Sequence, residues 1–175
     1  MQRLYQGVIE THLNDFDQMV FLSGPRQSGK TTTARHIAAS YNGMYLNWDL
    51  VTDREQILSP PQNLLSSLNL NVASAQTPLI ILDGIHKYAQ WKSYLKGFYD
   101  YTHWHQKIAI LVTGSARLDI YKKGSDSLMG RYFPYRIHPL SVREATLQPL
   151  GTNRMDPIQN PVKPPRDIYL SLIHI

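Results

Sequence analysis

Short runs of apolar residues alternate along the chain with stretches in which apolar positions recur at the spacing of a helix. The runs predict buried strands at residues 19–23, 44–48, 79–82 and 108–113, with 132–137 as a candidate fifth strand. Helical spacing predicts helices at residues 30–40, 53–58 and 90–101. Apolar strands that alternate with helices are typical of a parallel sheet covered on both faces. The pattern therefore predicts an α/β fold.

Four other segments have a less regular pattern. Residues 1–18 read as a short polar helix or arm, and residues 64–78 as a helix followed by a polar loop. Residues 115–130 read as a helix or loop, and residues 141–147 as the start of another helix. Pro60 and Pro61 are expected to stop the helix that precedes them.

The composition changes at Gln148. The stretch from Pro149 to Pro165 contains five prolines and few apolar residues, which is typical of a linker or of disordered chain. We therefore expect one domain over residues 1–147 and a proline-rich tail over residues 148–175. The last six residues, 170–175, match a peptide encoded by a transposon end used in sequencing-library preparation. We expect them to be adapter sequence, with a genuine apolar tail as the alternative.

The overall composition limits the classes of function. The chain has 175 residues, 42% hydrophobic and 18% charged, which is enough for one globular core. Its net charge of +5 suits polyanions such as nucleotides, nucleic acid or anionic lipid, and an ordinary basic surface is an equal alternative. The absence of cysteine excludes disulfides and thiol catalysis. Because there is no signal-peptide core and no apolar run of about 20 residues, we expect a soluble cytoplasmic protein without a membrane partner.

The clearest chemical motif lies between the first predicted strand and the first predicted helix. Residues Gly24–Thr31 read Gly-Pro-Arg-Gln-Ser-Gly-Lys-Thr and match the P-loop pattern G-x-x-x-x-G-K-[ST]. Glycines let such a loop curl with its amides toward phosphate oxygens, and the dipole of the following helix adds to the attraction. Lys30 is expected to contact the β- and γ-phosphates, and the Thr31 hydroxyl to ligate Mg²⁺. A glycine turn with an exposed lysine is the alternative, which the flanking strand and helix disfavour.

The motif predicts binding of a nucleoside triphosphate, most simply ATP with Mg²⁺. The residues predicted to bind the nucleotide are Gly24, Pro25, Arg26, Gln27, Ser28, Gly29, Lys30, Thr31 and Thr32. A P-loop also needs a carboxylate on a neighbouring strand to hold the metal ion. Asp83 follows the apolar run 79–82, so Thr31 and Asp83 are the predicted metal ligands, and an aspartate that caps a loop is the alternative.

Three further residues are candidates for catalysis beside Asp83. Thr113 and Ser115 follow the strand at 108–113, where a hydroxyl could contact the γ-phosphate or position water. The alternative is a turn whose hydroxyls cap the next helix. Arg131 precedes the last predicted strand and could stabilise charge on a transferring phosphoryl group, including one in a neighbouring subunit. A surface charge is the alternative.

Several further segments match one family in the order of that family. They are Tyr45–Asp49, Leu82–Tyr88 with Trp91 and Lys92, Leu95–Gly97, Thr113–Asp119, Asp126–Tyr132, His138–Ser141 and Glu144. Together with the P-loop, they make residues 1–147 resemble the AAA+-type ATPases of bacteria and archaea that carry an uncharacterised C-terminal domain. The resemblance implies a five-stranded, mostly parallel sheet of order 5-1-4-3-2. It also implies that Thr113 or Ser115 is the sensor and that Arg131 is an arginine finger.

The chain departs from the family pattern in two respects. The family's Walker B segment has a glutamate after the aspartate, and this chain has Gly84, which cannot activate water. The chain also stops before the helical lid, the winged helix and the C-terminal domain of the family, so we expect a truncated fragment. Asp49, at the end of the second predicted strand, is the other candidate acid for activating water.

Several functions are compatible with these features. The first is an ATPase module that couples ATP binding and hydrolysis to an absent C-terminal domain. The second is a nucleotide-binding scaffold or regulator without efficient hydrolysis, which Gly84 favours. A small-molecule phosphotransferase would need an acceptor pocket and a charged lid, and the sequence offers neither. A homo-oligomer, a protein partner and nucleic-acid binding all remain open.

Overall fold

The structure, a computed structural model, describes residues 3–41, 43–68, 77–115, 128–141 and Glu144. In this part of the chain helices and strands alternate. In order they are α1 (Leu4–Asp15), β1 (Met19–Ser23), α2 (Lys30–Ser40), β2 (Met44–Asn47), α3 (Val51–Leu58), α4 (Pro61–Ser67), β3 (Leu79–Asp83), the 3-10 helix η1 (Ile85–Lys87), α5 (Trp91–His105), β4 (Ala109–Gly114) and β5 (Tyr132–Arg136).

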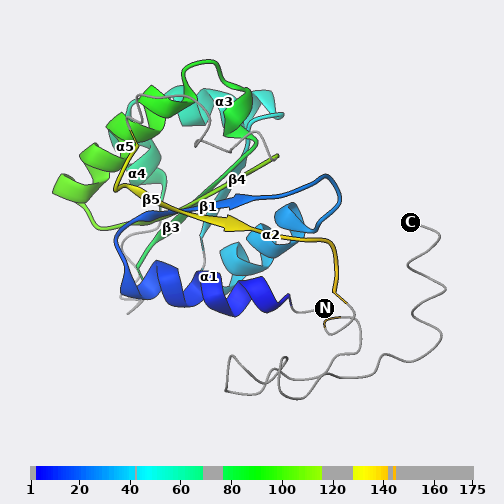
Figure 1. Cartoon of the computed structure of the whole chain (residues 1–175). Helices are drawn as coiled ribbons and strands as arrows, with labels where there is room; N and C mark the ends of the chain where they lie inside the picture. The colour runs from blue at the N-terminus through cyan, green and yellow to red at the C-terminus, as the bar shows by residue number, and fades with distance from the viewer. Residues whose placement is uncertain (1–2, 42, 69–76, 116–127, 142–143, 145–175) are drawn as a thin grey trace, which may run out of the picture.

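The strands form one five-stranded parallel sheet in the order β2-β3-β4-β1-β5 (Figure 1). This is the predicted order 5-1-4-3-2 read from the other edge, so the predicted α/β P-loop fold is confirmed. The chain leaves β1 for the far edge at β2, returns through β3 and β4, and adds β5 on the other side of β1. Ligands of such sheets bind beyond the carboxyl ends of the strands, near the point where the strand order reverses.

Helices cover both faces of the sheet, with α1 and α2 on one face and α3, α4 and α5 on the other (Figure 1). Alternate residues of β1 point into the two cores, as the pleat of a strand requires. Val20 and Leu22 belong to the core that α1 and α2 cover, and Met19 and Phe21 belong to the core that α5 covers. Both cores are buried, which explains why β1, β3 and β4 are apolar along most of their length.

The helices agree with the sequence pattern and refine it. The N-terminal segment, predicted as a short polar helix or arm, is a helix of 12 residues that buries Ile9 and Leu13. The predicted apolar face of residues 90–101 is present in α5, where Leu95 and Phe98 are buried. Pro61 is the first residue of α4, a position favoured for proline because its missing amide would have no partner within the helix.

Some predictions concern residues outside the described ranges. Most of the predicted helix or loop at 115–130 lies there, as does the segment 141–147 apart from Ser141 and Glu144. The predicted tail 148–175, with its last residues 170–175, lies there entirely. Among the helices that the structure does describe, none combines the length and the apolarity needed to cross a bilayer.

Candidate nucleotide-binding site

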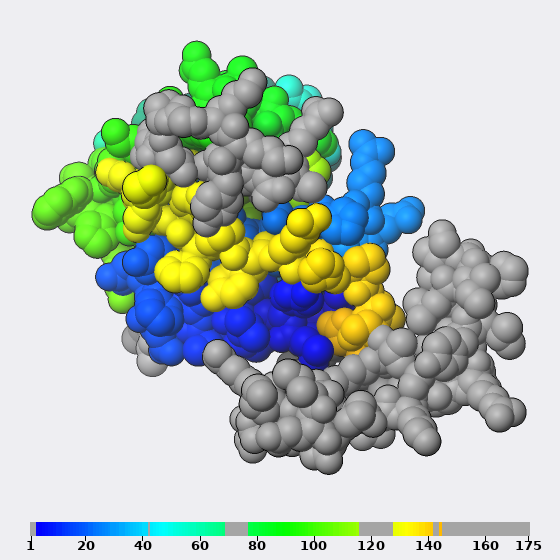
Figure 2. All heavy atoms as spheres, viewed as in Figure 1, coloured from blue at the N-terminus to red at the C-terminus, as the bar shows by residue number. Residues whose placement is uncertain are grey.

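The predicted P-loop joins the end of β1 to the start of α2 and is the blue loop beyond β1 in Figure 1. The same blue segment stands out from the surface in Figure 2, and Pro25, Arg26 and Gln27 are exposed. Gln27 has a φ of 61° and Gly29 a φ of 86°, both in the left-handed region. Non-glycine residues adopt that region at a cost of about 1–2 kcal/mol, and such strain gathers at ligand sites. The helix α2 starts directly after Gly29, so its first amides face the loop.

Lys30 places its ammonium group inside this loop. Its Nζ atom donates to the carbonyl oxygens of Gly24, at 3.1 Å, and Pro25, at 2.5 Å, and to Ser28 Oγ at 3.4 Å. Burial lowers the pKa of Lys30 below its ordinary value, and the negative charge of Asp83 partly offsets this effect. The ammonium can bind phosphate by exchanging these neutral acceptors for charged oxygens, which form stronger hydrogen bonds.

Asp83, the last residue of β3, accepts hydrogen bonds from three hydroxyl groups. Thr31 and Tyr45 donate to its Oδ2 atom at 2.8 and 2.6 Å, and Thr113 donates to its Oδ1 atom at 2.5 Å. Asp83 and Thr113 are paired in register across β3 and β4, which explains their contact. Burial and the hydrogen bond to Asp83 raise the pKa of Tyr45 to about 12, so this hydroxyl remains a donor at neutral pH. The carboxylate is thus fixed in one orientation.

Thr31 and Asp83 fit the chemistry of a Mg²⁺ site. The hydroxyl oxygen and the carboxylate oxygen lie 2.8 Å apart and line one cavity with Lys30. Magnesium prefers oxygen ligands, and in nucleotide sites it is held by one or two protein oxygens together with phosphates and water. The described residues contain no cluster of three or more histidine, aspartate or glutamate side chains that could hold a metal ion by themselves. This is the donor set expected where the nucleotide supplies the remaining ligands.

The P-loop and the carboxyl ends of the strands enclose a cavity of about 840 Å³. This volume suits a nucleotide, because small-molecule sites span about 300–1,000 Å³. The described residues that line it are Gly24, Pro25, Arg26, Lys30, Thr31, Asn47, Asp49, Asp83, Gly84, His86, Lys87, Gly114 and Ser115. The two predicted metal ligands and the P-loop lysine are therefore brought to one place.

The two sensor candidates lie in different surroundings. Thr113 is fully buried and its hydroxyl donates to Asp83, so it orients that carboxylate. Ser115 lines the cavity, and its Oγ atom lies 3.1 Å from His86 Nε2 in a hydrogen bond whose direction depends on the tautomer of the histidine. Of the two hydroxyls, that of Ser115 is the one that a ligand in the cavity could reach.

Gly84 adopts a backbone conformation that favours glycine. Its φ is 79°, and its amide donates to the carbonyl oxygen of Thr113 at 2.9 Å. A Cβ atom at this position would lie 3.7 Å from Trp48 Cβ, an ordinary contact, so a side chain would meet strain in the backbone and not a lack of space. Among the described residues that line the cavity, Asp49 is the one acid besides Asp83, and it is paired with Lys87 at 2.5 Å.

Arg131 lies at the amino-terminal ends of the strands, whereas the P-loop lies at their carboxyl ends. Its carbonyl oxygen accepts from the amide of Met19, the first residue of β1, whereas the P-loop follows the last residue of that strand. Five residues of strand span about 16 Å. The guanidinium is held by Asp100 through bonds of 2.7 and 3.2 Å, and this contact lowers the pKa of the Asp100 carboxyl. Arg131 therefore does not join the other candidates in the site of its own chain.

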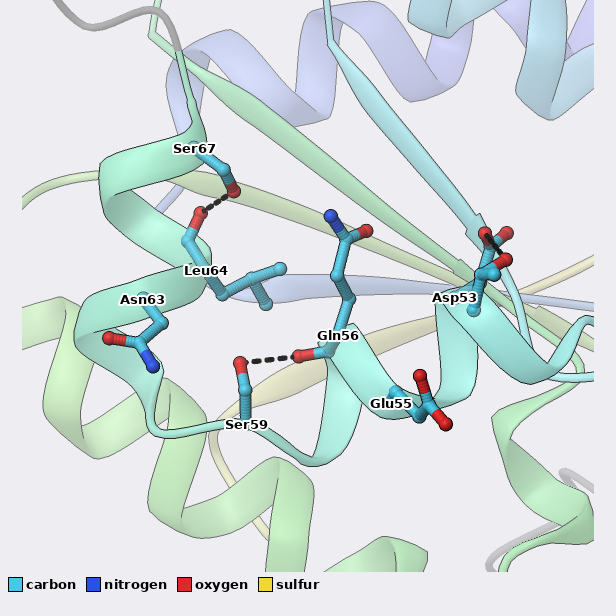
Figure 3. A pocket seen from close by; sticks show the side chains of 8 residues that line it. Asp53, Glu55, Gln56, Ser59, Asn63, Leu64 and Ser67 are labelled. Carbon is cyan, nitrogen blue, oxygen red and sulfur yellow. Dashed lines mark hydrogen bonds between the residues drawn. The ribbon is translucent and has the colours of Figure 1, made fainter.

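A second cavity, of about 560 Å³, lies between α3 and α4 (Figure 3). The figure shows the hydroxyls of Ser59 and Ser67 turned onto the carbonyls of Gln56 and Leu64 in the adjacent helical turns. The described residues that line this cavity include acids and amides but no lysine, arginine or histidine. It therefore lacks the positive charge that a phosphate group needs.

The fold and the grouping of Lys30, Thr31 and Asp83 define an α/β protein of the P-loop NTPase class. A family model described as "AAA domain" matches residues 16–146, and the chain belongs to this family of AAA+-type ATPase-like domains. Among solved structures, the structure of C. elegans PCH-2 is similar, with a TM-score of 0.50 and 15% identity over 81% of this chain. At this identity the likeness shows the fold alone, and the match spans 41% of the PCH-2 chain. A search of curated proteins gave no match.

Sequence reasoning assigned no role to Tyr45 and His86, which both contact candidate site residues. Tyr45 lies two residues before the end of β2, and its hydroxyl reaches Asp83, 38 positions further along the chain. The guanidinium of Arg35 lies 5.1 Å from the centroid of its ring and helps to hold it. The available signal was the adjacency of β2 and β3 in the predicted sheet order, which places these two strand ends side by side.

Proposed function

We propose that the chain binds ATP together with Mg²⁺, as the nucleotide-binding module of an AAA+-type ATPase. The observation that carries the proposal is the 2.8 Å hydrogen bond between Thr31 Oγ1 and Asp83 Oδ2, in the cavity that Lys30 also lines. Lys30 and Thr31 begin α2, whereas Asp83 ends β3. Their convergence with the P-loop amides combines a phosphate site and a metal site in one place.

Each group in this site has a definite task. The loop amides and the Lys30 ammonium bind the phosphates, and the Thr31 hydroxyl and the Asp83 carboxylate hold the metal ion. When bound, Mg²⁺ offsets negative charge on the β- and γ-phosphate oxygens. Thr113 keeps Asp83 in position, and Ser115 contacts the γ-phosphate or a water molecule beside it.

Membership of the AAA family supports an ATPase-like nucleotide-binding module. The proposal extends beyond this to hydrolysis and to coupling with a C-terminal domain. Arg131 then serves the site of a neighbouring subunit in a homo-oligomer, and its distance from the P-loop of its own chain supports that role. Binding of nucleic acid through the net charge of +5 stays a prediction. Salt-dependent binding to DNA would test it separately.

The metal dependence of ATP binding tests the proposal. Affinity for labelled ATP is measured with Mg²⁺ and with a chelator, in the parent chain and in Asp83→Asn, an uncharged variant of equal size. We expect the chelator to weaken binding by the parent strongly and binding by Asp83→Asn little. Asp17→Asn is the control, because Asp17 pairs with Lys107 on the surface. An equal response to the chelator in the parent and in Asp83→Asn would contradict the assignment of Asp83.

A second candidate function is a nucleotide-binding scaffold without efficient turnover. The observation that favours it is the left-handed backbone at Gly84, with a φ of 79°. A glutamate would be strained in that conformation, so the local backbone is suited to glycine. Glycine also lacks the carboxylate that would activate water. Phosphate release that depends on Lys30 separates the two functions, because a scaffold binds ATP and releases little phosphate.

A further inference from the structure

A buried arginine lies behind the P-loop, outside the set of residues that face the nucleotide. Arg3 precedes α1 and is 9% exposed. Its guanidinium donates through three nitrogens: Nε to Glu144 Oε1 at 2.8 Å, Nη1 to the carbonyl oxygen of Ser28 at 2.7 Å, and Nη2 to that of His138 at 2.7 Å. One side chain thus joins the P-loop, the segment after β5 and Glu144. These parts lie 25, 135 and 141 positions away along the chain.

The contact with Ser28 fixes the direction of a phosphate-binding amide. The described chain has no cis peptide bonds, so the Ser28 carbonyl and the Gly29 N–H point in opposite directions from their shared peptide group. Because Arg3 holds the carbonyl from the interior, the N–H of Gly29 is aimed away from the interior, into the loop. Rotation of this peptide would turn the amide away from a bound phosphate.

Gly29 itself is adapted to the arginine. A Cβ atom at this position would lie 2.7 Å from Arg3 Nη1, and the φ of 86° disfavours a side chain independently. The guanidinium therefore occupies the space in which a side chain of residue 29 would lie. A glycine at this position of the P-loop pattern thus suits both the left-handed turn and the observed place of the guanidinium.

Glu144 holds the other end of the arginine and is itself firmly placed. Its Oε2 atom accepts from the amide and the hydroxyl of Ser141 at 2.9 and 3.0 Å, and its own amide donates to Ser141 Oγ at 3.2 Å. This reciprocal pair has the hydrogen-bond pattern of a capping box and holds the Glu144 side chain against Ser141. Its Oε1 atom accepts from Arg3 and from the amide of Leu4 at 3.0 Å. The Glu144 side chain is 2% exposed.

A buried ion pair is weak evidence for stability, because desolvation offsets its attraction. What the pair does provide is geometry, since the planar guanidinium presents its donors in a fixed arrangement that lysine cannot reproduce. We propose that Arg3 is a positioning residue for the phosphate site, and that Glu144 sets its position. The contacts of Arg3 with the segment after β5 and the affinity for nucleotide are then coupled. The inference rests on the proposed nucleotide binding.

Such coupling is reciprocal. If the contact between Glu144 and Arg3 raises the affinity of the P-loop for phosphate, then bound nucleotide stabilises that contact by the same free energy. The described segment after β5, residues 137–141 with Glu144, would in this way respond to the nucleotide state of the loop through the Arg3 side chain.

The test compares ATP affinity in the parent, Arg3→Ala, Arg3→Lys and Glu144→Gln. Lys96→Ala, an exposed site on α5, is the control, and Lys30→Ala is the blank. Both Arg3 variants are expected to weaken ATP binding by at least about tenfold, as for loss of a charge-assisted contact. Glu144→Gln is expected to weaken it less, and the double variant Arg3→Lys with Glu144→Gln is expected to show less than the sum of the two effects. Arg3→Lys serves where Arg3→Ala does not fold.

The amide resonance of Gly29 in ¹⁵N-labelled protein reports directly on the Ser28–Gly29 peptide, to which Glu144 is joined through Arg3. It is expected to shift in Arg3→Lys and in Glu144→Gln even without nucleotide. Affinity within twofold of the parent and an unmoved Gly29 resonance in a folded Arg3→Lys would overturn the inference. An effect of Arg3→Lys with none of Glu144→Gln would overturn the coupling. Failure of the parent to bind ATP better than Lys30→Ala would instead contradict the proposed function, and the Gly29 resonance would still test the positioning.

Discussion

Thr113 lies directly opposite Asp83 in the sheet, and its fully buried hydroxyl donates a 2.5 Å hydrogen bond to the Oδ1 atom of that carboxylate. This contact leaves the other carboxylate oxygen, Oδ2, on the side of Thr31 and Tyr45. The strand β4, which contains Thr113, therefore controls the orientation of the proposed metal ligand. A role as a direct γ-phosphate sensor fits Ser115 better than Thr113.

Replacement of Thr113 by valine should weaken Mg²⁺-dependent ATP binding about fivefold. Valine keeps the size of threonine but removes the donor to Asp83, and one such hydrogen bond contributes about 1 kcal/mol. The measurement is ATP affinity with Mg²⁺ and with a chelator. Thr102→Val is the matched control, because Thr102 is also buried and donates to the carbonyl of Tyr99 within α5. Equal affinities in the two valine variants would contradict this role of Thr113.

Replacement of Gly84 by glutamate should raise phosphate release while lowering thermal stability. The carboxylate supplies a general base, worth typically about 10²–10⁴-fold, and the left-handed backbone costs about 1–2 kcal/mol. Gly84→Ala is the control, since it has the backbone strain without the carboxylate. Steady-state phosphate release and melting temperature are measured with Lys30→Ala as the blank. Equal, Lys30-dependent turnover in the parent, Gly84→Ala and Gly84→Glu would mean that another residue activates the water.

Stability at acid pH should depend on Glu144. Burial acts to raise the pKa of Glu144, but hydrogen bonds from Ser141, Arg3 and Leu4 outweigh it, so the pKa lies below the ordinary value of 4.5. A carboxyl with a lowered pKa in the folded state stabilises it above about pH 4.5, and this contribution is lost as the pH falls further. The free energy of unfolding of the parent should therefore fall more steeply below that pH than the free energy of unfolding of Glu144→Gln. Parallel pH profiles of the two proteins would refute this.

Replacement of Arg131 by alanine should leave ATP affinity unchanged within about twofold. The reason is that Arg131 lies at the amino-terminal ends of the strands, away from the P-loop at their carboxyl ends. It should reduce turnover only in an assembled form, if a neighbouring subunit uses the guanidinium. Asp100→Ala is the control, because it removes the same partly exposed ion pair but keeps the arginine. It therefore separates the effect of losing the ion pair from the effect of losing the positive charge of Arg131. Loss of nucleotide binding by monomeric Arg131→Ala would rule out action in a neighbouring subunit.

The strands and the P-loop were predictable because their signals are local. The runs at 19–23 and 79–82 are continuous and apolar, and the P-loop is a fixed pattern of eight residues. Asp83 was predictable because it follows such a run. The contact of Tyr45 with Asp83 depends on the adjacency of β2 and β3, which only the family resemblance implied. The contacts of Arg3 were not predictable, because its partners lie far along the chain and are set by the path of the segment after β5. Sequence alone also assigned Thr113 and Ser115 one shared role, since only packing shows which hydroxyl is buried.

The central claim, that the loop from Gly24 to Thr31 binds nucleotide phosphates, is tested most directly by ATP affinity in Lys30→Ala. The measurement is equilibrium binding of labelled ATP with Mg²⁺ to the parent, to Lys30→Ala and to the surface control Lys96→Ala, each shown to be folded by circular dichroism. The loss of a charge-assisted contact of about 1.5–3 kcal/mol predicts affinity about ten- to a hundredfold weaker in Lys30→Ala, with Lys96→Ala equal to the parent. Unchanged affinity in a folded Lys30→Ala protein would contradict the account.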